Sequence, residues 1–101
     1  MIRVLLADDD YLVKDVLQSM IPWEELGMEM IGFAEDGKQT LELCLEQKPD
    51  LLITDIRMPL LSGLEVALCL REQNQKTRVV LISGIQDFDY ARTALDVQAD
   101  G

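Results

Sequence analysis

The fold is decided by the stretch D-L-L-I-T-D-I-R-M-P, which runs from Asp50 to Pro59. Its short apolar run, Leu51 to Ile53, is typical of a strand buried on both faces in a parallel sheet. Pro59 cannot donate a ladder hydrogen bond, so the strand ends before it. Asp55 is therefore expected at or just past the carboxyl end of the strand, where open α/β sheets bind ligands. A carboxylate there is a cap, a metal ligand or a nucleophile.

Strands and helices alternate on both sides of this stretch. The expected strands cover residues 2–7, 28–34, 51–53 and 79–82, and apolar residues at helical spacing mark helices within 13–20, 40–47, 64–71 and 88–95. This alternation predicts a doubly wound parallel α/β sheet with right-handed crossovers. A closed eight-unit barrel needs about 200 residues or more and is excluded. We expect one domain spanning residues 1–101.

Composition excludes several classes of function. The formal net charge of −10 argues against direct binding to nucleic acid, which requires a basic face. The sequence has no histidine, so imidazole chemistry is absent. Cys44 and Cys69 lack C-x-x-C spacing, and we expect two buried free thiols in a reducing compartment. The sequence shows neither a signal peptide nor an apolar stretch that could span a bilayer, so the expected location is the cytoplasm.

Polar residues follow three of the expected strands. Asp8, Asp9 and Asp10 come after the first strand, Asp55 after the third and Ser83 after the fourth. The carboxyl ends of parallel strands share one edge, so these side chains converge if the first and third strands are neighbours. Crowded carboxylates raise one another's pKa unless a cation neutralises them. Because the ligands on offer are oxygen atoms, the expected ion is Mg²⁺ or Mn²⁺ and not zinc.

Phosphoryl transfer onto Asp55 is the chemistry that suits such a site. A divalent ion beside a carboxylate offsets the charge of a transferring phosphoryl group and aligns it. Aspartate is a known covalent acceptor of phosphate, and the Ser83 hydroxyl could couple phosphorylation to loop position. Each cluster alone is a weak indication, since aspartate pairs after strands are usually caps or turns. The combination favours the functional interpretation.

In combination these motifs resemble the receiver domain of two-component response regulators, and the resemblance covers the whole chain. The matching segments are L-L-A-D-D-D (5–10), I-T-D-I-R-M-P (53–59), S-G-L-E (62–65) and L-I-S-G (81–84). The segments I-P-W-E-E-L-G (21–27) and G-I-Q-D-F-D-Y-A (84–91) are similar to receivers that precede AraC-type DNA-binding output domains. The resemblance implies a flavodoxin-like fold with sheet order 2-1-3-4-5.

The resemblance also implies residue roles and partners. Asp55 would be the phosphoacceptor, and Asp9 and Asp55 would bind Mg²⁺ directly. Asp8 would assist through water, the backbone carbonyl of Arg57 would complete the protein ligands, and Ser83 would be the switch hydroxyl. The implied partners are a sensor histidine kinase and the parent protein's own C-terminal DNA-binding domain. The implied function is that of a phosphoacceptor signalling domain and not of an enzyme. The only catalysis implied is autocatalytic phosphotransfer from a phosphodonor.

One departure from the family concerns the C-terminal end. Receivers continue with a fifth strand that carries an aromatic residue and a Lys-Pro pair, then a fifth helix, whereas this sequence stops at Asp100-Gly101. The expected sheet order is therefore 2-1-3-4, and an exposed fourth strand suggests a homodimer or strand-swapped dimer. The alternative function is a receiver-like interaction or dimerisation module with an impaired phosphorylation site. A metal-dependent phosphohydrolase is disfavoured, because Arg57 stands where such enzymes place a second acid.

Overall fold

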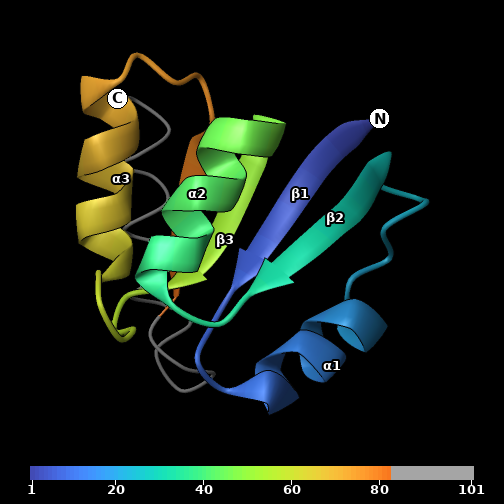
Figure 1. Cartoon of the computed structure of the whole chain (residues 1–101). Coiled ribbons are helices and arrows are strands. Elements are labelled where there is room, and N and C mark those ends of the chain that lie inside the picture. The colour runs from blue at the N-terminus through green and yellow to red at the C-terminus, as the bar shows by residue number, and fades with distance from the viewer. Residues whose placement is uncertain (83–101) are drawn as a thin grey trace.

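The computed structural model describes residues 1–82 as four strands and three helices. The elements, in chain order, are β1 (Ile2–Ala7), α1 (Tyr11–Met20), β2 (Met28–Ala34), α2 (Gly37–Gln47), β3 (Leu51–Asp55), α3 (Gly63–Glu72) and β4 (Arg78–Ile82). The strands form one sheet in the order β2-β1-β3-β4 (Figure 1). This order is the one expected from the sequence for the four strands and makes the fold flavodoxin-like.

The strand register brings the ends of β1 and β3 together. All three strand pairings are parallel, and Ala7 lies opposite Thr54, one residue before Asp55. On the far side of β3, Asp55 pairs with Ile82 at the end of β4. The residues that follow β1 therefore start beside the last residue of β3, which is the convergence that a site at this edge requires.

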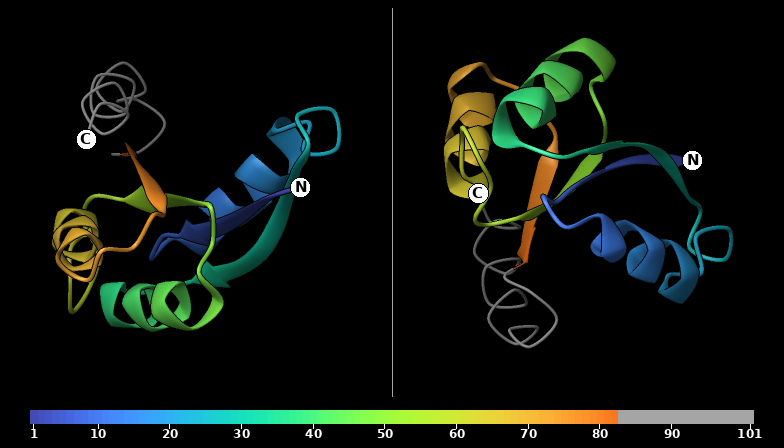
Figure 2. Two further views of the ribbon diagram at one scale, coloured as in Figure 1. Left: turned by 90° about the horizontal axis from the view of Figure 1, so that it is seen from above. Right: turned by 60° about the horizontal axis from the view of Figure 1, so that its bottom comes forward.

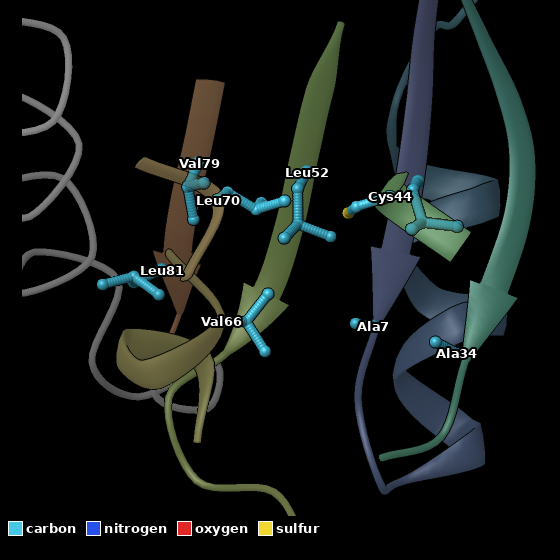
Figure 3. Close-up of a cluster of buried hydrophobic side chains, with 9 residues drawn as sticks. Ala7, Ala34, Cys44, Leu52, Val66, Leu70, Val79 and Leu81 are labelled. Carbon is cyan, nitrogen blue, oxygen red and sulfur yellow. The ribbon is translucent and has the colours of Figure 1, made fainter. Parts of the chain in front are cut away.

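Helices cover both faces of the sheet. Helices α2 and α3 lie on one face and α1 on the other, as the two views of Figure 2 show. A continuous apolar core fills the space between the sheet and the α2–α3 layer (Figure 3). Its buried members are Leu5, Ala7, Ala34, Cys44, Leu52, Val66, Leu70, Val79 and Leu81. Removing this apolar surface from water is the main favourable contribution to folding.

Each helix begins at a capping side chain. Asp10 accepts a hydrogen bond from the Leu12 amide, and Asp36 accepts one from the Gln39 amide. Ser62 forms a capping box with Glu65 at the start of α3. The expected start of the second helix near residue 40 was therefore too late, because the Asp36 cap allows α2 to begin at Gly37.

Small residues form the most deeply buried stripe of α2. Leu41 and Leu45, which lie on one face at helical spacing, are only partly buried. The fully buried residues are Gly37, Thr40 and Cys44. The Thr40 hydroxyl donates to the Asp36 carbonyl oxygen over 2.6 Å, so this buried polar group is satisfied. The small side chains let α2 approach its neighbours closely, and the leucines flank that contact.

Some expectations fall outside the described part of the chain. The expected helix within residues 88–95 and the Ser83 hydroxyl both lie beyond residue 82. Within residues 1–82 both cysteines are free thiols; Cys44 is buried as expected, whereas the expected burial of Cys69 was wrong, because this residue is only half-buried. In the same part of the chain, the helices are too short or too polar to cross a lipid bilayer.

Candidate metal centre

Three carboxylates meet at the carboxyl edge of the sheet. Asp8 and Asp9 follow β1 directly, and Asp55 is the last residue of β3. Each offers one carboxylate oxygen, and these three oxygens lie within 4.8 Å of one another. The structure thus brings together three of the residues singled out from the sequence. Asp10 is not part of this cluster, because its side chain caps the start of α1.

Asp8 forms the buried side of this acidic cluster. Only 6% of its surface is exposed, and its Oδ1 accepts a 2.8 Å hydrogen bond from the Asp10 amide. Burial raises the pKa of the Asp8 carboxyl from 3.8 to about 6. The Asp10 amide opposes this shift, while the negative charges of Asp55 and Asp9 add to it. The folded chain therefore holds Asp8 in a setting that disfavours its ionised form.

Asp55 shares this electrostatic setting but remains partly open to solvent. Burial is the main cause that raises the pKa of the Asp55 carboxyl, and the Asp9 charge adds to the effect. The backbone amides of Arg57 and Ile56 act in the opposite direction, as does the positive charge of Arg57. Arg57 itself is exposed. Asp55 therefore combines a raised pKa with access from solvent.

The donor set fits a hard divalent cation. It consists of carboxylate oxygens at the carboxyl ends of two adjacent strands, and burial and mutual repulsion raise the pKa of both Asp8 and Asp55. A cation of charge +2 would relieve both effects, and oxygen ligands suit Mg²⁺ and Mn²⁺. The chemistry available to such an ion is stabilisation of negative charge next to the Asp55 oxygens.

The loop between β3 and α3 is fixed by backbone hydrogen bonds. The Ile56 amide donates to the Ile82 carbonyl over 3.0 Å, and the Gly63 amide donates to the Ile56 carbonyl over 2.8 Å. Thr54 is fully buried, with its hydroxyl 3.0 Å from the Asp55 carbonyl oxygen. These bonds hold the backbone on either side of Arg57, whose carbonyl is the fourth expected ligand.

Sequence reasoning missed two residues that support this site. Thr54 lay beyond the strand expected at 51–53, and Gly63 lay in the loop before the helix expected within 64–71. An ideally placed Cβ at Gly63 would overlap the Asp55 carbonyl oxygen, so glycine permits α3 to start directly behind Asp55. The S-x-x-E spacing of Ser62 and Glu65 was available in the sequence as an indication that a helix starts here.

Fold and site together define a class of protein. A parallel sheet of order β2-β1-β3-β4 with an acidic cluster at the carboxyl ends of β1 and β3 is the architecture of a receiver module. A family model supports this directly, because the response regulator receiver domain matches residues 4–101. The chain belongs to this family, as its sequence motifs implied.

Curated relatives are transcriptional regulators of bacteria. The chain is 34% identical over 95 residues to the uncharacterized transcriptional regulatory protein YesN of Bacillus subtilis, covering 94% of this chain and 26% of that protein. It is 32% identical over 97 residues to the transcriptional regulatory protein HptR of Staphylococcus aureus, covering 94% of this chain and 37% of that protein. The chain thus spans between a quarter and two fifths of the length of these relatives.

Solved structures give the same family. The receiver domain of AraT, a response regulator from Geobacillus stearothermophilus, matches with a TM-score of 0.79 at 35% identity, over 97% of this chain and 77% of that one. A two-component transcriptional regulator AraC from Clostridium phytofermentans matches with a TM-score of 0.73 at 33% identity, over 93% and 73% of the two chains. The expected similarity to receivers of AraC-type regulators is therefore found.

Proposed function

We propose that residues 1–101 act as a phosphoacceptor receiver domain whose Asp55 is phosphorylated in the presence of Mg²⁺. The observation that carries this proposal is the meeting of the Asp8, Asp9 and Asp55 oxygens within 4.8 Å at the carboxyl edge of the sheet. Family membership supports the reaction class. Asp55 is the member of the cluster that combines a position at the end of β3 with access to solvent.

In the proposed reaction an Asp55 carboxylate oxygen attacks the phosphorus of a phosphodonor. A bond forms between that oxygen and phosphorus, the bond between phosphorus and the donor atom breaks, and the electron pair leaves with the donor. Mg²⁺ bound at this edge supplies positive charge that stabilises the transferring group. Asp9 and Asp55 would hold the ion directly, Asp8 through water, and the Arg57 carbonyl would complete the set.

In this proposal Asp8 is the buried carboxylate of the ion-binding cluster. Burial is the main cause that raises the pKa of the Asp8 carboxyl, the charges of Asp55 and Asp9 add to it, and the 2.8 Å hydrogen bond from the Asp10 amide fixes the orientation of the side chain. The cluster is therefore arranged in advance for a cation, at a cost in stability when the cation is absent. Ser83 is proposed as the hydroxyl that bonds the phosphoryl group after transfer.

The proposed partners follow from the relatives. A sensor histidine kinase is the proposed phosphodonor, and a DNA-binding output domain in the longer parent protein is the proposed target of the signal. The similarity to the transcriptional regulatory protein HptR supports this assignment, and the relatives are long enough to hold a further domain. The proposed location is the cytoplasm, where transcription is controlled.

The test is chemical labelling of the full chain. Incubation with acetyl phosphate and Mg²⁺ should add one phosphoryl group, detected by intact mass and mapped to Asp55. Asp55→Asn and excess EDTA should each abolish labelling. Asp36→Asn is the matched control, because Asp36 also follows a strand and asparagine can still cap α2. Labelling that survives in Asp55→Asn would contradict the proposal, and a folded chain that takes no label would favour the interaction module.

A further inference from the structure

The short turn between β2 and α2, residues Ala34–Gly37, contacts both sides of the acidic cluster. On one side the Asp8 amide donates to the Ala34 carbonyl over 3.0 Å. On the other side the Gly37 amide donates to the Pro59 carbonyl over 3.1 Å. Pro59 lies in the loop that follows Asp55 and carries Arg57. One turn of chain therefore joins the backbone next to Asp8 with the loop next to Asp55.

The turn is itself held rigidly. Asp36 accepts from the Gln39 amide over 2.7 Å, and Gln39 Oε1 accepts from the Glu35 amide over 2.9 Å. These two bonds differ from a capping box, because Gln39 bonds the amide of Glu35 and not that of the cap residue Asp36, but together they fix the backbone at the start of α2. A rigid turn bonded to two sides of a cluster resists movement of one side relative to the other.

Gly37 is the point of closest approach in this arrangement. An ideally placed Cβ at this position would overlap the backbone carbonyl of Leu61, in the same loop as Arg57 and Pro59. The φ of Gly37 lies outside the left-handed region, so alanine could adopt its conformation. Alanine would also favour the helix. Glycine is needed here because two backbone segments meet, and a rigid carbonyl, unlike a side chain, cannot turn aside.

We propose that Gly37 is a positioning residue for the acidic site: it lets the β2–α2 turn clamp the β3–α3 loop and so sets where the loop's backbone oxygens stand relative to Asp8 and Asp9. This inference rests on the proposed Mg²⁺ site. Groups that hydrogen-bond a metal ligand change metal affinity by about ten- to 100-fold when they are altered. Gly37 acts one step further out, through the backbone of Pro59 and Leu61, so Gly37→Ala is expected to weaken Mg²⁺ binding by about tenfold, at the lower end of this range.

The test compares Mg²⁺ affinity with stability in two matched variants of the full chain. Gly32→Ala is the control, because its Cβ would meet only the end of the Leu5 side chain, at 3.3 Å, and does not approach the loop. Mg²⁺ affinity is measured by calorimetry, and the free energy of unfolding by urea titration. If the two variants have equal free energies of unfolding, Gly37→Ala should still bind Mg²⁺ much more weakly than Gly32→Ala does. Unchanged affinity in a folded Gly37→Ala chain would overturn the proposal.

A second measurement uses the unsubstituted chain and holds if Gly37→Ala fails to fold. In a Mg²⁺ titration followed by amide NMR, the Gly37 signal should shift with the same midpoint as the signal of Asp9. The Gly27 amide, which donates to Glu24 in the connector before β2, should not move. If the Asp9 amide signal shifts during the titration and the Gly37 amide signal does not, the proposal is overturned. A chain that binds no Mg²⁺ at all would instead remove the proposed metal site itself.

Discussion

Replacing Asp8 with asparagine should stabilise the folded chain at neutral pH when divalent ions are absent. Asp8 is almost fully buried, and burial raises the pKa of its carboxyl from 3.8 to about 6. The charges of Asp55 and Asp9 contribute in the same direction. Asparagine removes the negative charge but keeps an oxygen that can accept the hydrogen bond from the Asp10 amide. The substitution therefore isolates the cost of the charge.

The magnitude follows from proton linkage. Because the pKa is raised by folding, the folded chain binds this proton more tightly than the unfolded chain does, and stability falls as pH rises from about 4 to about 6. Each pH unit between the two pKa values corresponds to about 1.4 kcal/mol. Solvent at the open side of the cluster screens part of this free-energy cost. Asp8→Asn should gain about 1 to 3 kcal/mol at pH 7 and almost nothing below pH 4.

The assay is urea unfolding of both chains across this pH range with EDTA, repeated with saturating Mg²⁺. Mg²⁺ should stabilise the unsubstituted chain and reduce the advantage of Asp8→Asn, since the ion neutralises the same charge. Equal stability of the two chains at pH 7, or a difference independent of pH, would refute the reasoning. Either result would mean that folding does not raise the pKa of the Asp8 carboxyl.

Three further predictions concern the scaffold that holds the site. Ser62→Ala removes the capping box at the start of α3 and should lower the free energy of unfolding by about 1 kcal/mol. Ser19→Ala removes an exposed hydroxyl that donates to the Asp15 carbonyl within α1, and it should cost less. Leu70→Ala empties a fully buried core position and should cost about 2 to 5 kcal/mol in urea unfolding; a cost below 1 kcal/mol would contradict the described packing. Burial raises the pKa of the Cys44 thiol to about 12, so a thiol reagent should label half-buried Cys69 in the folded chain and reach Cys44 only on unfolding. Equally fast labelling of both cysteines would contradict the burial of Cys44.

Much of the fold could be predicted because its local pattern agrees with its tertiary role. The apolar run from Leu51 to Ile53 is followed closely by Asp55 and then by Pro59, and three aspartates follow the first apolar run directly. Both features depend on single segments of chain. Neighbouring parallel strands then bring Asp8 and Asp9 to Asp55 without any further information from the sequence.

The residues that escaped prediction depend on contacts between distant segments. Residues 35–37 lie between the strand expected at 28–34 and the helix expected at 40–47. The Asp36 cap that starts α2 is local, but the need for glycine at Gly37 comes from the Leu61 carbonyl in the loop after β3. Gly63 looked like a loop residue, and its need for glycine comes from the Asp55 carbonyl behind it. The periodicity of apolar residues in a sequence does not indicate where two backbone segments come into contact. The raised pKa of Asp8 is equally a product of tertiary burial, which the three adjacent aspartates do not specify.

The most direct test of the central claim is a crystal structure of the chain soaked with Mn²⁺, using the anomalous signal of the ion to locate it. We expect one strong peak at the carboxyl edge of the sheet, with oxygens of Asp9 and Asp55 and the Arg57 carbonyl around it and Asp8 one water molecule away. A cluster without a peak at saturating Mn²⁺, or an ion bound elsewhere while the three carboxylates stay empty, would contradict the account.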